Sequence, residues 1–147
     1  FKAYSKDLLK YLRRYLTLLP ILVGGSLILG GCQTSKPSNC NQLIQVTNTA
    51  KSLSVAKNSA EFIKLTKDLD QLNLRVQAIA IEDPKLNEFK TQFSQLYLGI
   101  AQASRQVSQA SLTRDRDLLN QAQKNLKTSI VKEQSLVVAV NQYCSQN

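Results

Sequence analysis

Large apolar residues recur at alternating intervals of three and four along two long stretches of the chain, residues 62–79 and residues 86–110. This spacing keeps the apolar side chains on one face of an α-helix with a period near 3.5 residues. The first run is Phe62, Leu65, Leu69, Leu72, Val76 and Ile79; the second is Leu86, Phe89, Phe93, Leu96, Ile100, Ala103, Val107 and Ala110. The sequence therefore predicts an all-α fold in which each helix buries one face against the others.

Two helix starts carry clear capping signals. Asn58 is a favoured N-cap residue, and Glu61 follows it three positions later, as in a capping box. Asp83 stands directly before Pro84; proline is disfavoured inside a helix but suits its first position, and Asp can cap the free amides. We therefore expect one helix after Asn58, ended by the Asp83-Pro84 step, and another that starts there.

The first and last helices are expected at the two ends of the same region. Asn39 is taken as the N-cap of a first helix that runs to about Ala56. Thr113 is taken as the cap of a fourth helix that runs to about Cys144. Its apolar face would consist of Leu119, Ala122, Leu126, Ile130, Leu136, Val137, Val140 and Tyr143. Residues 40–147 are thus predicted to form a four-helix up-down bundle.

The start of the chain is typical of an export signal. Basic residues dominate the first fourteen positions, and residues 15–31 carry no charge. A basic segment followed by a short apolar one is the pattern that directs a chain to the membrane. Because the chain begins with Phe1 and contains no Met, we also expect a few natural residues to precede Phe1.

The apolar segment stops at the sequence Leu29-Gly30-Gly31-Cys32, which resembles the lipobox of bacterial lipoproteins. The resemblance implies that residues 1–31 are a signal peptide, that Cys32 receives a diacylglycerol, and that residues 32–39 are a short tether from lipid to bundle. An uncleaved membrane anchor and a buried core helix are the two alternatives. In either membrane case the positive residues stay in the cytoplasm, and the bundle lies on the periplasmic or lumenal side.

Two cysteines remain after Cys32, and in an exported protein they are most simply a disulfide. Cys40 falls in the first predicted helix turn and Cys144 in the last. An even number of antiparallel helices returns the chain to the end where it began, whereas three helices would separate the cysteines by roughly 40 Å. A disulfide requires Cα atoms within about 7 Å. Four helices and a Cys40–Cys144 bond therefore support each other; free or intermolecular thiols are the alternative.

The composition argues against most enzyme classes. The chain has no His, which removes the commonest general base and a usual metal ligand. Neither a catalytic motif nor a phosphate-binding glycine loop occurs, so we expect no catalytic residues, no metal and no cofactor. The net charge is +9, but basic residues interleaved with aromatics are missing, and we expect no nucleic-acid binding. The positive charge keeps the domain soluble or attracts anionic lipid or an acidic partner.

Three polar features of the helices could have a functional or a structural role. Arg105, Arg114 and Arg116 lie around the predicted turn between the third and fourth helices; they are either a solvated helix end with local ion pairs or a patch that binds a partner. Glu133 falls on or beside the inward face of the fourth helix. It is expected at the edge of the bundle or paired with an Arg, a Tyr hydroxyl or water. Tyr97 is expected to complete the core with its hydroxyl at the rim.

The sequence thus predicts a membrane-anchored, extracytoplasmic lipoprotein that acts as a non-catalytic binding or assembly module, with a lipid bilayer and a membrane protein complex as partners. The alternative is a carrier that holds a small apolar ligand inside the bundle. The plan of a lipobox followed by a helical bundle is similar to that of small helical lipoproteins of cyanobacteria, including extrinsic photosystem lipoproteins. Seams filled by Leu and Phe favour a closed interior, and so the binding module.

Overall fold

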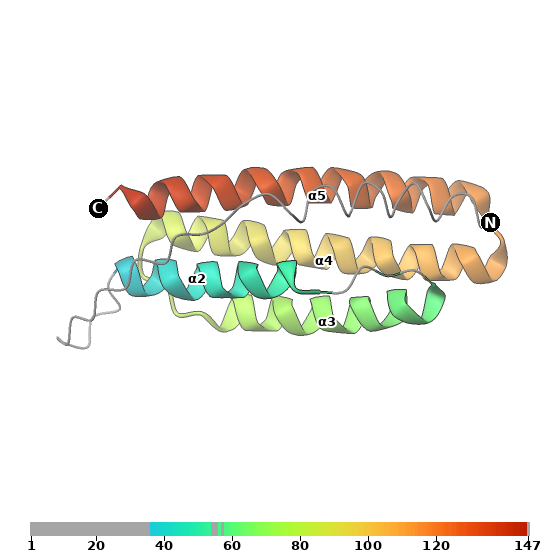
Figure 1. Ribbon diagram of the computed structural model, residues 1–147, viewed down its shortest axis with the longest axis horizontal. Helices are drawn as coiled ribbons and strands as arrows, with labels where there is room; N and C mark the ends of the chain where they lie inside the picture. Colours follow the sequence, from blue (N-terminus) through green and yellow to red (C-terminus); the bar gives the residue numbers. More distant parts are fainter. Residues whose placement is uncertain (1–35, 54–55, 57, 147) are drawn as a thin grey trace.

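The computed structural model describes residues 36–53, 56 and 58–146, and within them it contains four helices and no strands. The helices are α2 (Lys36–Lys51), α3 (Ser59–Ala78), α4 (Pro84–Thr113) and α5 (Arg116–Ser145). They pack against one another as a bundle (Figure 1), so the predicted four-helix fold is confirmed. The predicted signal helix lies outside the described residues.

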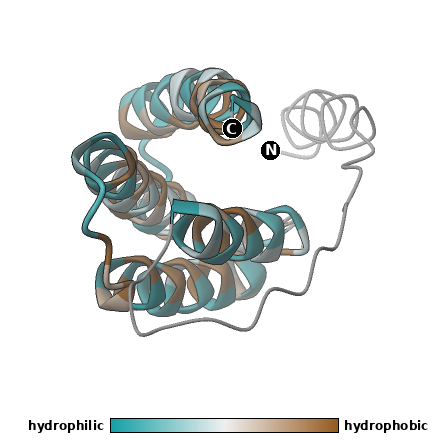
Figure 2. Ribbon diagram, turned by 90° about the vertical axis from the view of Figure 1, so that its left-hand side faces the viewer, coloured by the Kyte–Doolittle hydropathy of each residue, from teal (hydrophilic) through white to brown (hydrophobic). Residues whose placement is uncertain are grey.

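The four helices run alternately up and down along one long axis (Figure 1). α4 packs along both α3 and α5, while α2 packs more lightly against α3 and α5 and closes the ring opposite α4. Seen end-on in Figure 2, the apolar residues of the helices gather toward the middle of the bundle. This is the arrangement that one apolar face per helix dictates.

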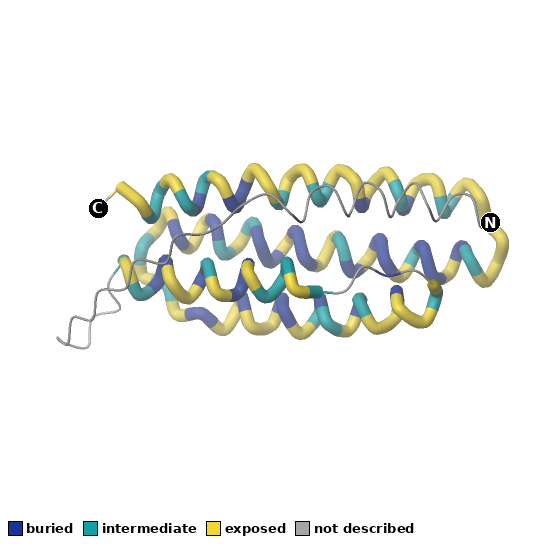
Figure 3. Tube along the Cα trace, in the orientation of Figure 1, coloured by how far each residue is buried: buried dark blue, intermediate teal, exposed yellow. Residues whose placement is uncertain are grey.

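The core divides into two clusters along the axis. The larger cluster draws on all four helices and includes Leu43 of α2, Val76 of α3, Phe93 of α4 and Val140 of α5. The smaller one lies beyond the end of α2 and draws on α3, α4 and α5. It consists of Phe62, Ala103, Val107, Ala122 and Leu126, together with Ala56 from the segment that follows α2. Buried positions accordingly follow the inner faces of the helices along the whole bundle (Figure 3).

Helix α2 differs from its prediction at both ends. It starts at Lys36, so the last four residues of the predicted tether form its first turn and Asn39 lies inside the helix. Pro37 sits in that first turn, where its missing N–H costs nothing. The helix ends at Lys51, five residues before the predicted Ala56. Near that end the hydroxyls of Thr49 and Ser52 donate hydrogen bonds to nearby helix carbonyls. Ser and Thr are poor helix formers because their side chains compete for backbone hydrogen bonds in this way.

The other boundaries depend on caps, and two of them are confirmed. Asn58 accepts a hydrogen bond from the Glu61 amide at 3.0 Å, and Asp83 accepts one from the Leu86 amide at 2.8 Å. The predicted cap Thr113 is wrong: it is the last residue of α4, and Asp115 caps α5 instead. The intervening residue Arg114 ends α4 in the left-handed conformation with φ of 58°, a common helix ending.

Candidate functional site

The predicted lipidation residue, Cys32, lies outside the described residues. Among the residues that the structure does describe, no helix combines the length and the apolar character needed to cross a bilayer.

Cys40 and Cys144 are joined by a disulfide at the end of the bundle where α2 begins and α5 ends. Their Cα atoms are 5.9 Å apart, and 104 positions separate them in the sequence. The bond therefore ties the first described helix to the last.

A cluster of polar and aromatic groups surrounds this end. The Tyr143 hydroxyl donates to Asp83 Oδ2 at 2.9 Å, and Lys36 Nζ lies 4.0 Å from the centre of the Tyr143 ring. The Phe89 ring meets Tyr143 edge-on at 6.0 Å. The hydrogen bond from the Leu86 amide is the main cause that lowers the pKa of Asp83, and the Asp83 carboxylate in turn raises the pKa of Tyr143. These contacts hold the ends of α2, α4 and α5 together, and we assign the cluster a structural role.

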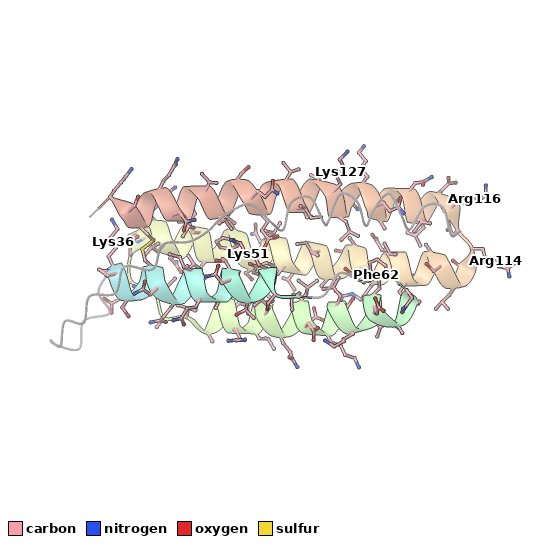
Figure 4. All side chains as sticks on the ribbon, in the orientation of Figure 1. Lys36, Lys51, Phe62, Arg114, Arg116 and Lys127 are labelled. Atoms are coloured by element: carbon pink, nitrogen blue, oxygen red, sulfur yellow. A yellow bond between two sulfur atoms is a disulfide. The ribbon has the colours of Figure 1, made fainter. Side chains whose placement is uncertain are left out.

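The three arginines of the predicted partner patch lie at two levels of the bundle. Arg105 lies more than two helical turns before Arg114 and pairs with Asp70 of α3 at 3.1 Å. Arg114 and Arg116 lie at the opposite end of the bundle from Lys36, where α4 and α5 join (Figure 4). Both are exposed and flank the cap residue Asp115. Arg105 is thus half of an α3–α4 ion pair, and the remaining two arginines belong to a solvated turn.

Glu133 is half-buried on α5, and burial is the main influence on its carboxylate. It lies near Lys51, at the end of α2, and near the Tyr97 hydroxyl of α4. Burial raises the pKa of Glu133, while Lys51 and Tyr97 act in the opposite direction. Burial and the neighbouring carboxylate also raise the pKa of Tyr97.

Tyr97 corrects a second prediction. Its side chain is 0% exposed, and its hydroxyl is buried beside the Glu133 carboxylate, just beyond hydrogen-bonding distance of any partner, so the hydroxyl does not lie at the rim. The reason is that α2 and α5 cover this level of α4, which the apolar spacing of α4 alone does not reveal. Ser104, two turns further along α4, is likewise buried without a hydrogen-bond partner.

A polar groove lies between α4 and α5, and sequence reasoning did not identify it. Its volume is about 310 Å³. The lining residues are Gly99, Gln102, Ala103 and Gln106 of α4, and Lys124, Asn125, Thr128 and Ser129 of α5. The signal in the sequence is the spacing of the polar residues themselves: Gly99, Gln102 and Gln106 follow one another at three and four, beside the apolar seam.

The groove is rich in hydrogen-bonding groups that have no protein partner. Within the described part of the chain, the amide and hydroxyl side chains of Gln102, Gln106, Asn125, Thr128 and Ser129 make no hydrogen bond. The ideal Cβ position of Gly99 has no atom within 4 Å, which leaves the space above it open. Such a groove can offer donors and one ammonium group to a ligand rich in oxygen acceptors.

The described residues contain no group of three or more Cys, Asp or Glu side chains arranged to hold a metal ion. Comparison of the chain with protein-family models, with curated proteins and with solved structures found no match.

Proposed function

We propose that this protein is a bacterial lipoprotein, anchored in a bilayer through a lipid on Cys32, whose bundle acts as a non-catalytic binding or assembly module. The observation that carries the proposal is the sequence Leu29-Gly30-Gly31-Cys32, which directly follows a basic segment and an uncharged one. A lipid on Cys32 would confine the bundle to the membrane surface and raise its effective concentration near a membrane complex.

The disulfide supports the extracytoplasmic location. Bonds of this kind persist in oxidising compartments and are rare in the reducing cytoplasm. The Cys40–Cys144 bond links the first and last described helices at one end of the bundle, as expected for a small exported domain that must stay folded on the periplasmic or lumenal side.

The filled interior favours a binding module over a carrier of apolar ligands. Ligand pockets usually measure about 300–1,000 Å³ and are mainly apolar. Here the rings of Phe93 and Tyr97 stack at 5.9 Å in the larger core cluster, with Leu43, Leu72 and Leu86 fully buried in the same cluster. Large side chains thus occupy the space that a ligand would need, and binding is expected on the surface.

Mass spectrometry of the protein extracted from bacterial membranes tests the anchor. We expect a mature chain that starts at Cys32 and carries diacylglycerol, and we expect the Cys32→Ala variant to keep residues 1–31 and acquire no lipid. An unmodified wild-type chain that retains residues 1–31 would contradict the proposal and favour the uncleaved anchor.

Cross-linking in intact membranes, followed by affinity isolation of the lipidated protein, tests the assembly role. We expect a membrane protein complex to be recovered in constant proportion to the bait. Recovery of free monomer alone would contradict the assembly role while leaving the anchor intact.

A further inference from the structure

The surface shared by α4 and α5 combines exposed polar and apolar side chains. We call it the α4–α5 face. On each helix its residues are three or four positions apart, so each set lies on one side of its helix. The residues are Gln95, Gly99, Gln102 and Gln106 of α4, and Lys124, Thr128, Val131, Ser135 and Val138 of α5. All but Gln106 are exposed.

Lys124 is the charged residue of this face. None of the residues of the face is acidic, and Glu133, the carboxylate of α5 nearest in sequence, points into the bundle. Lys124 lines the groove, and Lys132, which follows Val131 in the sequence, is exposed on the same helix. The outer side of α3 is different, because acidic and basic residues alternate there and pair, as Lys64 does with Asp68 at 2.6 Å.

Large apolar side chains stand beside the lysines. Val131 is 57% exposed and Val138 is 44% exposed on α5. A helix surface that combines lysines with exposed apolar residues is suited to the boundary between lipid headgroups and acyl chains.

The groove supplies the remaining part of such a contact. A phosphodiester headgroup carries several oxygen acceptors and one negative charge, and Gln102, Asn125 and Thr128 offer uncommitted donors next to the ammonium group of Lys124. A charge-assisted hydrogen bond from Lys to phosphate is stronger than one between neutral groups. The space above Gly99 lets a headgroup approach the α4 backbone.

We propose that the α4–α5 face lies against the headgroups of anionic phospholipids, so that the bundle rests on its side on the membrane. This inference deepens the proposed function and depends on it for the delivery of the bundle to a bilayer. The positive charge, the exposed valines and the groove with unpaired donors all favour a membrane surface over an acidic protein, which would not require the apolar residues to be interspersed with the lysines.

The chain contains no Trp, so a single introduced Trp reports its own surroundings. Full-length Val131→Trp protein is mixed with vesicles of phosphatidylcholine alone, or with 30% phosphatidylglycerol, each containing brominated lipid that quenches Trp fluorescence. The matched control is Leu74→Trp on α3, a site that is 65% exposed. We expect Trp at position 131 to be quenched in the anionic vesicles at least threefold more than Trp at position 74, and this difference to disappear in phosphatidylcholine alone.

Charge variants test the role of the lysines. Near an anionic surface each Lys contributes about fivefold to binding, so Lys124→Gln with Lys132→Gln should weaken the quenching-detected association by roughly 30-fold. Lys64→Gln with Lys67→Gln on α3 should change it less than twofold. Equal effects of the two pairs would overturn the proposal, since they would mean that total charge and not this face determines association.

Vesicle flotation separates this inference from the proposed function. If a lipidated chain floats with both kinds of vesicle and Trp at position 131 is unquenched, the proposed contact of the α4–α5 face with lipid is overturned, and the proposed lipid anchor stands. If the chain is unlipidated, floats only with anionic vesicles and shows quenching at position 131, the contact of the α4–α5 face with lipid is supported and the proposed lipid anchor is contradicted. A chain that floats with neither contradicts both.

Discussion

At the scale of single residues, Glu133 shows how one charge inside an apolar bundle affects stability. Its carboxylate lies near Lys51 and Tyr97, and burial is the main cause of its raised pKa. In the unfolded chain the pKa of Glu is about 4.3. Between that pH and the higher pKa of the folded state, the folded protein binds more protons, so the free energy of unfolding falls as the pH rises.

Glu133→Gln is therefore expected to raise the free energy of unfolding at pH 7, because the amide has no charge to desolvate. It should also flatten the decrease in stability above about pH 4. Urea unfolding followed by circular dichroism at several pH values measures both effects. Glu82→Gln, at an exposed site between α3 and α4, is the matched control. A Glu133→Gln variant less stable than the parent at pH 7 would show that the contact with Lys51 outweighs the burial.

Gly99 gives a second prediction at this scale. Glycine inside a helix is less favourable than alanine by about 1 kcal/mol, and no atom would contact the added methyl group. Gly99→Ala should therefore stabilise the protein by up to about 1 kcal/mol, measured as a higher urea midpoint with an unchanged slope. Ala101→Gly, at a buried site two residues away, should instead destabilise it. Loss of stability in Gly99→Ala would mean that the groove is narrower than described.

At the scale of helices, capping side chains determined which boundaries could be predicted. Asn58 and Asp83 accept hydrogen bonds from amides in the first turns of α3 and α4, and their types and positions signal this in the sequence. The start of α2 at Lys36 was missed because Asn39 has the residue type of a cap but lies buried inside the helix. The end of α4 was missed because Arg114 adopts a left-handed conformation more usual for Gly or Asn.

The cap at Asp83 has two roles, since it also accepts the Tyr143 hydroxyl from α5. Asp83→Ala should lower the free energy of unfolding by about 1–2 kcal/mol, within the range for lost N-caps. Asp83→Asn retains an acceptor oxygen for the Leu86 amide and loses the one for the Tyr143 hydroxyl, so it should cost less than Asp83→Ala. Because the pKa of Asp83 is lowered in the folded state, the difference between wild type and Asp83→Ala should be full above about pH 4 and shrink as the pH falls below it. Urea unfolding at pH 7 and pH 2.5 measures this difference, and a pH-independent one would contradict the role of the carboxylate.

At the scale of the whole molecule, the apolar seams and the cysteine positions predicted the number of helices. They did not predict the groove on the surface or the burial of Glu133. The seam of α4, from Leu86 to Ala110, is buried except for the partly exposed Ile100. The reason is that a helix with one apolar face is stable only when this face packs against the core. The groove at Gly99 and Gln102 depends on how closely α4 and α5 approach each other, and the polar residues on its two sides carry no apolar pattern that fixes this approach. The burial of Glu133 is similar, since it depends on where α2 ends.

The short length of α2 makes the disulfide important for the molecule as a whole. α2 has 16 residues against 30 in α4 and packs lightly on its neighbours; the bond from Cys40 to Cys144 ties its first turns to α5. From chain entropy, closing a loop of 104 positions contributes at most about 4–5 kcal/mol. The double variant Cys40→Ser with Cys144→Ser should lose a large part of this amount in urea unfolding, and hydrogen exchange should rise first in α2. Reduced wild-type protein is the matched control and should unfold at the same urea concentration as the double variant. If the oxidised protein, the reduced protein and the double variant unfold alike, the bond does not stabilise the fold, and α2 must be held by its packing on α3 and α5 alone.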